Sequence, residues 1–185
     1  PYLTAIPDRG YTFVGWSSTC TGLGTCSVGS SGSVPGATFK APSPIDVGLN
    51  FSCQAQGNGA KCWGDNSSGQ IGNNSLANAL KSVSVNNLSG VAAVVTGGQH
   101  ACGLLNSGAV KCWGKNTNGQ LGNNSLTNAK TPVNVSGLSS AQSLSAGDSH
   151  TCVLMENGTV RCWGKGQGGR RGNGQTSDQK TSVQV

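Results

Sequence analysis

The stretch that decides the fold is QHACGLLNSGAVKCWG, residues 99–114. We interpret it as two short strands joined by a three-residue loop at 106–108, with Gly108 at the position that needs a positive φ. Opposite residues of an antiparallel pair alternate between hydrogen-bonded and non-hydrogen-bonded pairs. Counting back from the loop makes Cys102 and Cys112 a non-hydrogen-bonded pair, with Cα atoms about 4.5 Å apart and within disulfide range. The stretch therefore predicts a β-hairpin held by a disulfide.

The eight cysteines fall into four couples of this kind, and each couple encloses a short turn with the same parity. We therefore predict four cross-strand disulfides, each worth about 2–3 kcal/mol for so small a loop: Cys20–Cys26, Cys53–Cys62, Cys102–Cys112 and Cys152–Cys162. Zinc is the rival interpretation, but structural zinc sites use close pairs such as Cys-x2-Cys, and this sequence contains none. Disulfides predict an oxidising location, extracellular or at the cell surface.

The hairpin belongs to a repeat of 50 residues. Trp63, Trp113 and Trp163 are separated by this interval, and glycines, asparagines and valines around them follow the same spacing. A fixed period of this length marks a repeat architecture. Each unit contains four short strand-like stretches separated by Gly, Asn and Ser turns, the profile of a propeller blade. The sequence predicts an all-β fold with three four-stranded propeller-type blades over residues 45–185.

The repeats resemble those of the regulator of chromosome condensation family. The motifs that carry the resemblance are His-Ala-Cys and His-Thr-Cys, Val-Lys-Cys-Trp-Gly and Val-Arg-Cys-Trp-Gly, Gly-Gln-Leu-Gly-Asn and Pro-Val-Asn-Val. The cysteine-paired form is similar to secreted bacterial repeats. The resemblance implies a β-propeller, usually of seven blades, but no particular activity, because the fold serves many functions. Three repeats do not close such a ring, so we expect an incomplete propeller or an open array.

Two positions depart from the repeat pattern. Phe51 stands where the other repeats have His100 and His150. Arg170-Arg171 replaces the Gln-Ile and Gln-Leu of the first two repeats, which places charge at a normally apolar position.

Residues 1–41 do not follow the period. The motif GYTFVGW at 10–16, the couple Cys20-x5-Cys26 and the segment Ala-Thr-Phe at 37–39 resemble the second half of a divergent internalin B-type repeat, a small β module of bacterial surface proteins. We expect a partial β module at 1–41 and a linker at 42–44, where two prolines favour an extended connection.

The chain carries a formal net charge of +6, from 12 basic and 6 acidic residues. Five basic residues gather in the last repeat: Arg161, Lys165, Arg170, Arg171 and Lys180. They suggest an anion-attracting patch for acidic glycans or a negatively charged cell surface, although a polar, exposed capping repeat accounts for them better. We expect no nucleic-acid partner, because aromatic residues are not interleaved with the basic ones. No apolar run reaches the ~18 residues of a membrane span.

No constellation of polar residues predicts catalysis. We interpret His100 and His150 as buried rings bonded to a backbone group of the next strand or blade, and the three repeat tryptophans as core rather than a binding stripe. Residues 164–169 spell Gly-x-Gly-x-x-Gly, but no helix follows to hold a pyrophosphate. The six acidic residues are scattered, so no carboxylate pair is evident. We therefore predict no catalytic residue, no cofactor, no metal site and no enzymatic activity.

The favoured function is that of a non-catalytic extracellular bacterial structural or adhesive protein that self-associates into a larger or filamentous assembly. Exposed strand edges of an incomplete propeller favour pairing with another chain. The alternative is a secreted protein-binding propeller that inhibits or sequesters another extracellular protein.

Overall fold

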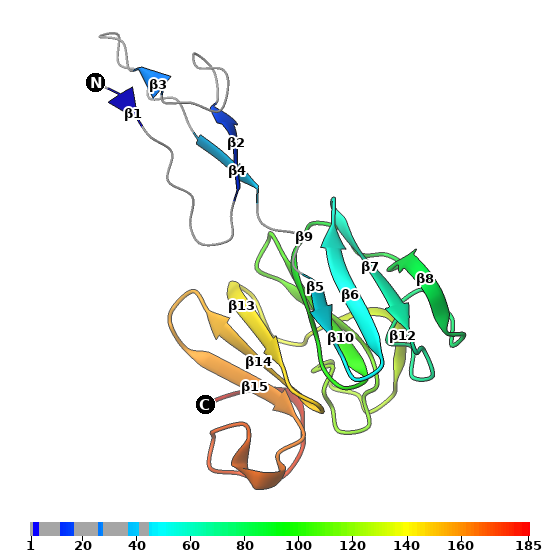
Figure 1. Cartoon of the computed structure of the whole chain (residues 1–185). Helices are drawn as coiled ribbons and strands as arrows, with labels where there is room; N and C mark the ends of the chain where they lie inside the picture. The colour runs from blue at the N-terminus through cyan, green and yellow to red at the C-terminus, as the bar shows by residue number, and fades with distance from the viewer. Residues whose placement is uncertain (1, 4–11, 17–25, 28–36, 41–44) are drawn as a thin grey trace. The chain divides into compact units, whose positions relative to one another are not determined.

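The computed structural model describes residues 2–3, 12–16, 26–27, 37–40 and 45–185. The chain forms two compact units, Pro1–Pro42 and Ser43–Val185, and each is described by itself. In the first unit β1 (Tyr2–Leu3) pairs with β3 (Cys26–Ser27), and β2 (Thr12–Trp16) pairs with β4 (Ala37–Lys40), both antiparallel (Figure 1). Cys20, and with it the predicted disulfide Cys20–Cys26, lies outside the described residues, as does the predicted linker at 42–44.

The second unit consists of three four-stranded antiparallel sheets, each formed by four consecutive strands. Blade 1 contains β5 (Ile45–Val47), β6 (Phe51–Gln56), β7 (Gly59–Gly64) and β8 (Ala79–Ser84). Blade 2 contains β9 (Val91–Thr96), β10 (His100–Leu105), β11 (Val110–Gly114) and β12 (Ala129–Asn134). Blade 3 contains β13 (Ala141–Ala146), β14 (His150–Met155), β15 (Val160–Gly164) and β16 (Gln179–Gln184), with a 3₁₀ turn at Gln167–Gly169.

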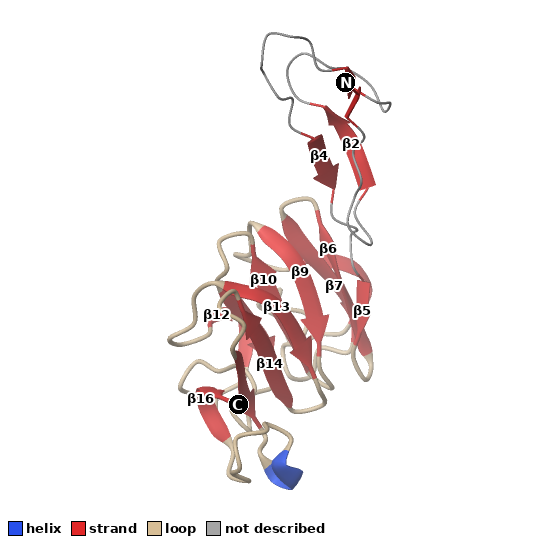
Figure 2. Ribbon diagram, turned by 90° about the vertical axis from the view of Figure 1, so that its left-hand side faces the viewer, coloured by secondary structure: helices blue, strands red, loops and turns tan. Residues whose placement is uncertain are grey.

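This architecture confirms the predicted all-β fold with three four-stranded blades. The first strands of the blades lie side by side, since β9 contacts both β5 and β13. Figure 2 shows the blades in a row, with blade 2 in the middle. The sheets do not close into a ring. No helix in the described part of the chain is long and apolar enough to cross a membrane.

The hairpins have the register that the loop lengths predict. In blade 2 Cys102 lies opposite Cys112, and the loop is closed by a 2.9 Å hydrogen bond from the Leu105 amide to the Ala109 carbonyl. Gly108 has a φ of 75°. Blade 1 reaches the same register with a loop one residue shorter. Disulfides join the opposed cysteines of all three blades, with Cα atoms 4.0–4.1 Å apart: Cys53–Cys62, Cys102–Cys112 and Cys152–Cys162.

The core lies between the blades rather than within one. The Cys53–Cys62 disulfide of blade 1 packs in one cluster with Val94 and Trp113 of blade 2. The opposite face of blade 2, which carries Cys102–Cys112, packs in a second cluster with residues of blade 3. A blade therefore buries both of its faces only when it has a neighbour on each side.

Candidate functional site

One tryptophan anchors blade 2 to blade 1, and another anchors blade 3 to blade 2. Trp113 is fully buried and donates its indole N–H to the Gln70 carbonyl of blade 1, at 2.9 Å. Trp163 makes the same 2.8 Å bond to the Gln120 carbonyl of blade 2. These contacts agree with the prediction that the tryptophans belong to the core for Trp113 and Trp163, whereas Trp63 of blade 1 is partly exposed.

A glycine next to each of these carbonyls makes room for the ring. Gly72 has a φ of 73°, and a Cβ atom there would lie 2.9 Å from Trp113 and 2.9 Å from Val85. Gly122 has a φ of 66° and stands in the same relation to Trp163 and Val135. Each interblade interface therefore needs a glycine, a free carbonyl and a tryptophan from the next blade.

His100 is fully buried at the interface between blades 2 and 3. Its Nε2 lies 2.9 Å from the Thr151 hydroxyl, which donates at 3.1 Å to the Gln120 carbonyl. Because that hydroxyl proton is used on the carbonyl, the network assigns the imidazole proton to Nε2. Burial lowers the pKa of His100 to about 4, with repulsion from His150 adding to the effect and Asp148 opposing it. The histidine is buried and reaches the next blade, as predicted, but its partner is a side-chain hydroxyl rather than the backbone.

At the interface between blades 1 and 2, apolar side chains occupy the positions of His100 and Thr151. Phe51 replaces the histidine and Ala101 replaces the threonine, and both are buried in one core cluster. The residue before the first cysteine of a hairpin therefore matches the side chain that it faces on the preceding blade. Ala101 faces Phe51, and Thr151 faces His100. This explains the departure at Phe51.

A buried asparagine organises the loop between the third and fourth strands in blades 1 and 2. The Asn66 amide nitrogen donates to the Ser75 and Ala77 carbonyls, both at 3.0 Å, and its oxygen accepts from the Ile71 amide at 2.9 Å. Asn116 makes the corresponding bonds in blade 2. This loop holds the buried Ile71 and Leu121 and the carbonyls that receive the tryptophans.

Blade 3 replaces this arrangement by a charged one. Gly166 stands at the asparagine position, and the Arg171 guanidinium reaches into the loop and donates from Nη2 to the Ser177 carbonyl. Asp178, which replaces Asn78 and Asn128, accepts from the Gly166 amide at 3.0 Å and from the Asn118 side chain at 2.7 Å. Gly166, Arg171 and Asp178 thus change together in the loop of this one repeat.

The charges of this loop act on each other. Burial lowers the pKa of Arg171, and the Asp178 carboxylate opposes that shift. Burial alone would raise the pKa of Asp178, but it is lowered by the hydrogen bonds from Gly166 and Asn118 and by the nearby Lys165 and Arg171 charges. Sequence reasoning missed this exchange, although the alignment of the repeats at positions 66, 116 and 166 contained the signal.

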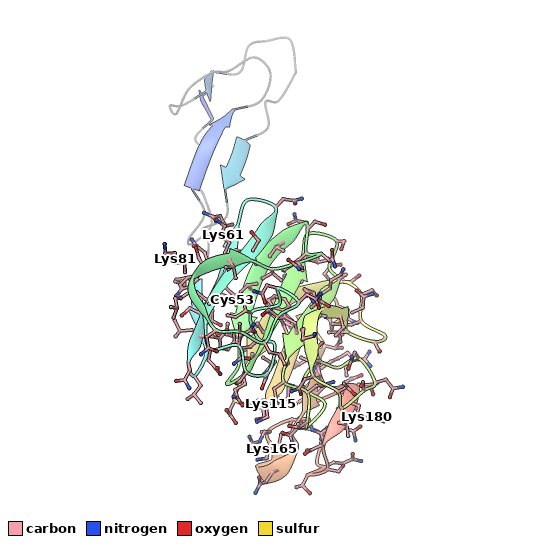
Figure 3. The ribbon with its side chains drawn as sticks, turned by 90° about the vertical axis from the view of Figure 1, so that its right-hand side faces the viewer. Cys53, Lys61, Lys81, Lys115, Lys165 and Lys180 are labelled. Atoms are coloured by element: carbon pink, nitrogen blue, oxygen red, sulfur yellow. A yellow bond between two sulfur atoms is a disulfide. The ribbon has the colours of Figure 1, made fainter. Side chains whose placement is uncertain are left out.

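Of the five residues in the predicted anion patch, Arg171 is not at the surface and Arg161 is only partly exposed. Arg171 is fully buried, because its side chain fills the space left by the missing asparagine. Arg161 is partly buried and donates to the Ser182 carbonyl at 3.1 Å. Lys165, Arg170 and Lys180 remain at least partly exposed, and the two lysines lie on the last blade in Figure 3.

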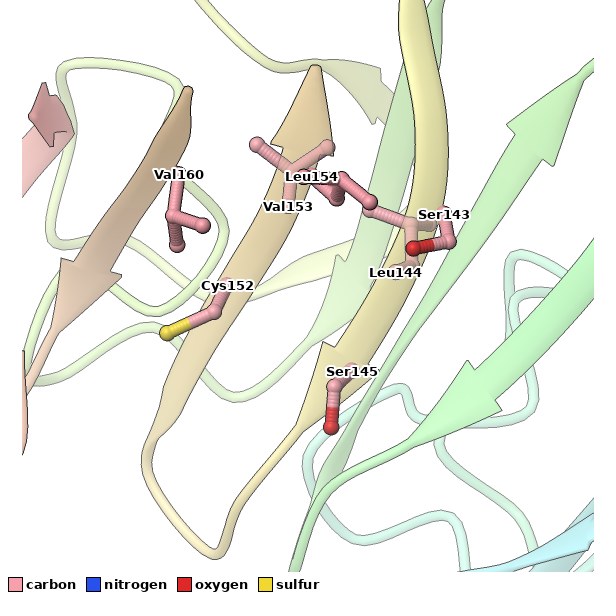
Figure 4. A pocket seen from close by; sticks show the side chains of 7 residues that line it. All are labelled: Ser143, Leu144, Ser145, Cys152, Val153, Leu154 and Val160. Carbon is pink, nitrogen blue, oxygen red and sulfur yellow. The ribbon is translucent and has the colours of Figure 1, made fainter. Parts of the chain in front are cut away.

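Two blade faces remain open. The open face of blade 1 carries a partly exposed tryptophan and exposed apolar side chains, and consists of Ile45, Val47, Ser52, Gln54, Lys61 and Trp63. The open face of blade 3 consists of Ser143, Ser145, His150, Cys152, Leu154, Val160 and Val185. Figure 4 shows its centre, an open hollow of about 200 Å³ beside the Cys152 sulfur and Val160.

The exposed fractions of equivalent valines show that this face lacks its cover. Val110 and Val135 of blade 2 are 2% and 5% exposed. Their counterparts in blade 3, Val160 and Val185, are 39% and 52% exposed. The open faces are therefore built like interior ones but are not buried.

A second hollow of about 270 Å³ lies where the loops after the first strands of the three blades meet. It is lined mostly by glycines and apolar residues, with the Asp148 carboxylate beside them. In residues 45–185 no three His, Cys, Asp or Glu side chains are placed to hold a metal ion. The candidate functional site is therefore the pair of open faces.

Comparison with protein families agrees with the resemblances predicted for both parts of the chain. Residues 107–154 match one regulator of chromosome condensation (RCC1) repeat family, and residues 91–120 and 141–175 match a second one. Residues 2–41 match the divergent InlB B-repeat domain. No curated protein matches the chain significantly.

Solved structures with this fold are larger. Prp20p from Saccharomyces cerevisiae is 20% identical with a TM-score of 0.68, covering 82% of this chain and 40% of Prp20p. Yeast RCC1 (Prp20) in the structure with Kap60 is 14% identical with a TM-score of 0.65, and the match covers 95% of this chain and 45% of the yeast protein. Human WBSCR16 is 18% identical with a TM-score of 0.66, and the match covers 76% of this chain and 38% of the human protein. The chain thus spans about two fifths of these proteins, and at this identity the likeness shows the fold alone. Residues 2–41 are therefore similar to a divergent InlB B-repeat domain and residues 91–175 to RCC1 repeats, and residues 45–185 form three blades of the RCC1-type propeller fold.

Proposed function

We propose that this chain is a non-catalytic extracellular or cell-surface bacterial protein, structural or adhesive in nature, that associates with further copies of itself. One observation carries the proposal: two blade faces built for burial are open at opposite ends of the row of blades. Burying apolar area favours association by about 25 cal/mol for each Å². A face with a partly exposed tryptophan and two exposed aliphatic side chains is an interaction surface.

The extracellular part of the proposal is supported by the disulfides. Five of the six cysteines in the three blades are less than 3% exposed, and four of them belong to the interblade clusters. The cross-links therefore fill the core as well as closing the hairpins, and such bonds persist in oxidising compartments.

The non-catalytic part is supported by the use of the polar groups. The buried His100, Asn66, Asn116 and Arg171 all make hydrogen bonds that organise the fold. The propeller fold hosts many functions and does not by itself imply catalysis.

The test is the mass of the full, oxidised chain in solution as a function of concentration, by analytical ultracentrifugation. We expect species heavier than 18.5 kDa that increase with concentration, because association follows mass action. A single monomeric species up to high micromolar concentration would contradict the proposal.

A second candidate function is binding of a different extracellular protein. It is favoured by one comparison: the structure of Prp20p, which shares the fold, is described together with binding properties to Gsp1p and histones. In that case the chain stays monomeric by itself and forms a complex only with its partner, so the same measurement separates the two functions.

A further inference from the structure

We propose that the open face of blade 3 binds the open face of blade 1 of a second copy, in the same register as the two interblade interfaces inside the chain. This inference rests on the proposed self-association and specifies its interface. The two open faces are the two halves of an interface that the chain already contains twice.

The receiving half is complete on blade 3. Gly172 has a φ of 70° and occupies the position of Gly72 and Gly122. At those two glycines a Cβ atom would meet both a valine of the same blade and the tryptophan of the next, whereas at Gly172 it would meet only Val185, at 2.7 Å. The valine side of the slot is therefore present and the tryptophan side is vacant.

The inserting half is complete on blade 1. Trp63 lies opposite Ser52, as Trp113 lies opposite Ala101 and Trp163 opposite Thr151. Its indole is partly exposed, whereas the other two are fully buried. Placed in the Gly172 slot, Trp63 donates to the Arg170 carbonyl, which corresponds to the Gln70 and Gln120 carbonyls.

The side chains at the position of the His100–Thr151 contact favour blade 1 as the blade that covers the open face of blade 3. His150 occupies the position of His100, which pairs with the Thr151 hydroxyl. Blade 1 presents Ser52 at the threonine position, so a hydroxyl faces His150. The equivalent residue of blade 2 is Ala101, which offers no hydrogen bond. Blade 1 thus fits blade 3 by the same rule that separates the two internal interfaces.

Two backbone hydrogen bonds also recur at the internal interfaces and continue across the new one. The Asn74 and Asn124 amides donate to the Lys130 and Lys180 carbonyls of the next blade, each at 2.9 Å. The corresponding bond runs from the Gly174 amide to the carbonyl of Leu80, whose residue is 96% exposed.

The second recurring bond lies near the inner strand ends. The Leu49 amide donates to the Gly98 carbonyl at 3.1 Å, and the Gly98 amide donates to the Asp148 carbonyl at 3.0 Å. The series continues from the Asp148 amide to the Leu49 carbonyl of the second copy. These main-chain bonds make the contact a continuation of the blade row.

An interface formed by two different faces is heterologous, so copies join head to tail and form either a closed ring or a filament. Two variants each block one half. Trp63→Ala removes the anchor and leaves the receiving slot intact, whereas Gly172→Ala fills the slot and leaves Trp63 intact. Gly168→Ala is the matched control, because Gly168 also has a positive φ but no atom lies within 4 Å of a Cβ there.

The experiment measures sedimentation of the full oxidised chain. We expect each blocking variant alone to weaken association about 30-fold or more, the effect of losing an interfacial hot spot, while Gly168→Ala associates like the wild type. An equimolar mixture of Trp63→Ala and Gly172→Ala is expected to form dimers that do not extend, because it offers one intact half from each variant. Circular dichroism and thermal unfolding of each variant verify the fold.

The outcomes separate this inference from the proposed function. Wild-type chain that stays monomeric overturns both. Association that survives Trp63→Ala overturns the interface but leaves self-association standing, and so does a mixture of the two variants that forms no dimer.

A second pair of variants tests the side-chain match. Ser52→Ala alone is expected to weaken association, and Ser52→Ala combined with His150→Phe is expected to restore it, because the pair then reproduces Ala101 and Phe51. Equal affinity for all three chains would show that these residues do not face each other.

Discussion

Acidification is expected to destabilise the interface between blades 2 and 3 through His100. The imidazole is fully buried, and its only hydrogen-bonding partner in the described structure is the Thr151 hydroxyl. Burial holds its pKa at about 4, below the ordinary 6.5. The unfolded chain therefore binds this proton more tightly than the folded chain does.

The sign and size follow from proton linkage. The contribution of His100 to stability is complete above pH 6.5, falls as the pH decreases through the window from 6.5 to about 4, and changes no further below it. At about 1.4 kcal/mol for each pKa unit, the loss amounts to about 3 kcal/mol. This loss is a large part of the unfolding free energy of a typical domain, which is about 5–15 kcal/mol.

The assay is urea unfolding of the oxidised chain at a series of pH values. The comparison is with the double variant His100→Phe/Thr151→Ala, which gives the second interface the residues of the first. His150 is present in both proteins, and burial, with Arg170 adding to the effect, also lowers its pKa. The difference between the two curves therefore isolates His100.

The expected result is a wild-type unfolding free energy that decreases by about 3 kcal/mol more than that of the double variant between pH 7 and pH 4. Parallel curves would refute the reasoning, because they would mean that His100 protonates in the folded protein without cost. A variant curve that falls more steeply than the wild-type curve would refute it as well.

Three further outcomes follow from the structure. Asn116→Ala should lower the unfolding free energy by about 2–4 kcal/mol, since the buried Leu121 amide and the Ser125 and Thr127 carbonyls lose their partner; urea unfolding measures this, with Asn106→Ala in an exposed loop as the control. Gly122→Ala should destabilise more than Gly174→Ala, because both have a positive φ but only the first Cβ meets Trp163, at 2.8 Å; thermal unfolding of the pair gives the cost of the clash, and equal melting temperatures would contradict it. Reduction of the disulfides should cost about 2–3 kcal/mol for each closed loop; unfolding with and without reductant tests this, and thiol alkylation before reduction should label none of the blade cysteines.

The candidate site was only partly predictable from the sequence. The repeat spacing identified the glycines and tryptophans that meet at the interfaces, because they recur at one interval. It did not reveal which face of a blade meets the next one, since that depends on how the sheets pack. The proposed role of Ser52 depends on the position of His100 against Thr151, which only the packed blades define.

Local chemistry in the sequence was enough to determine the hairpins. Strand parity and loop length place each blade cysteine opposite its partner, and neither depends on distant residues. The tertiary structure decided the fate of the charges and the faces. Arg171 is buried because Gly166 leaves a space in the folded loop, a space created by residues that only the packed loop brings together. The open faces likewise exist only as products of packing, because a blade face is an interior or a surface according to whether another blade covers it.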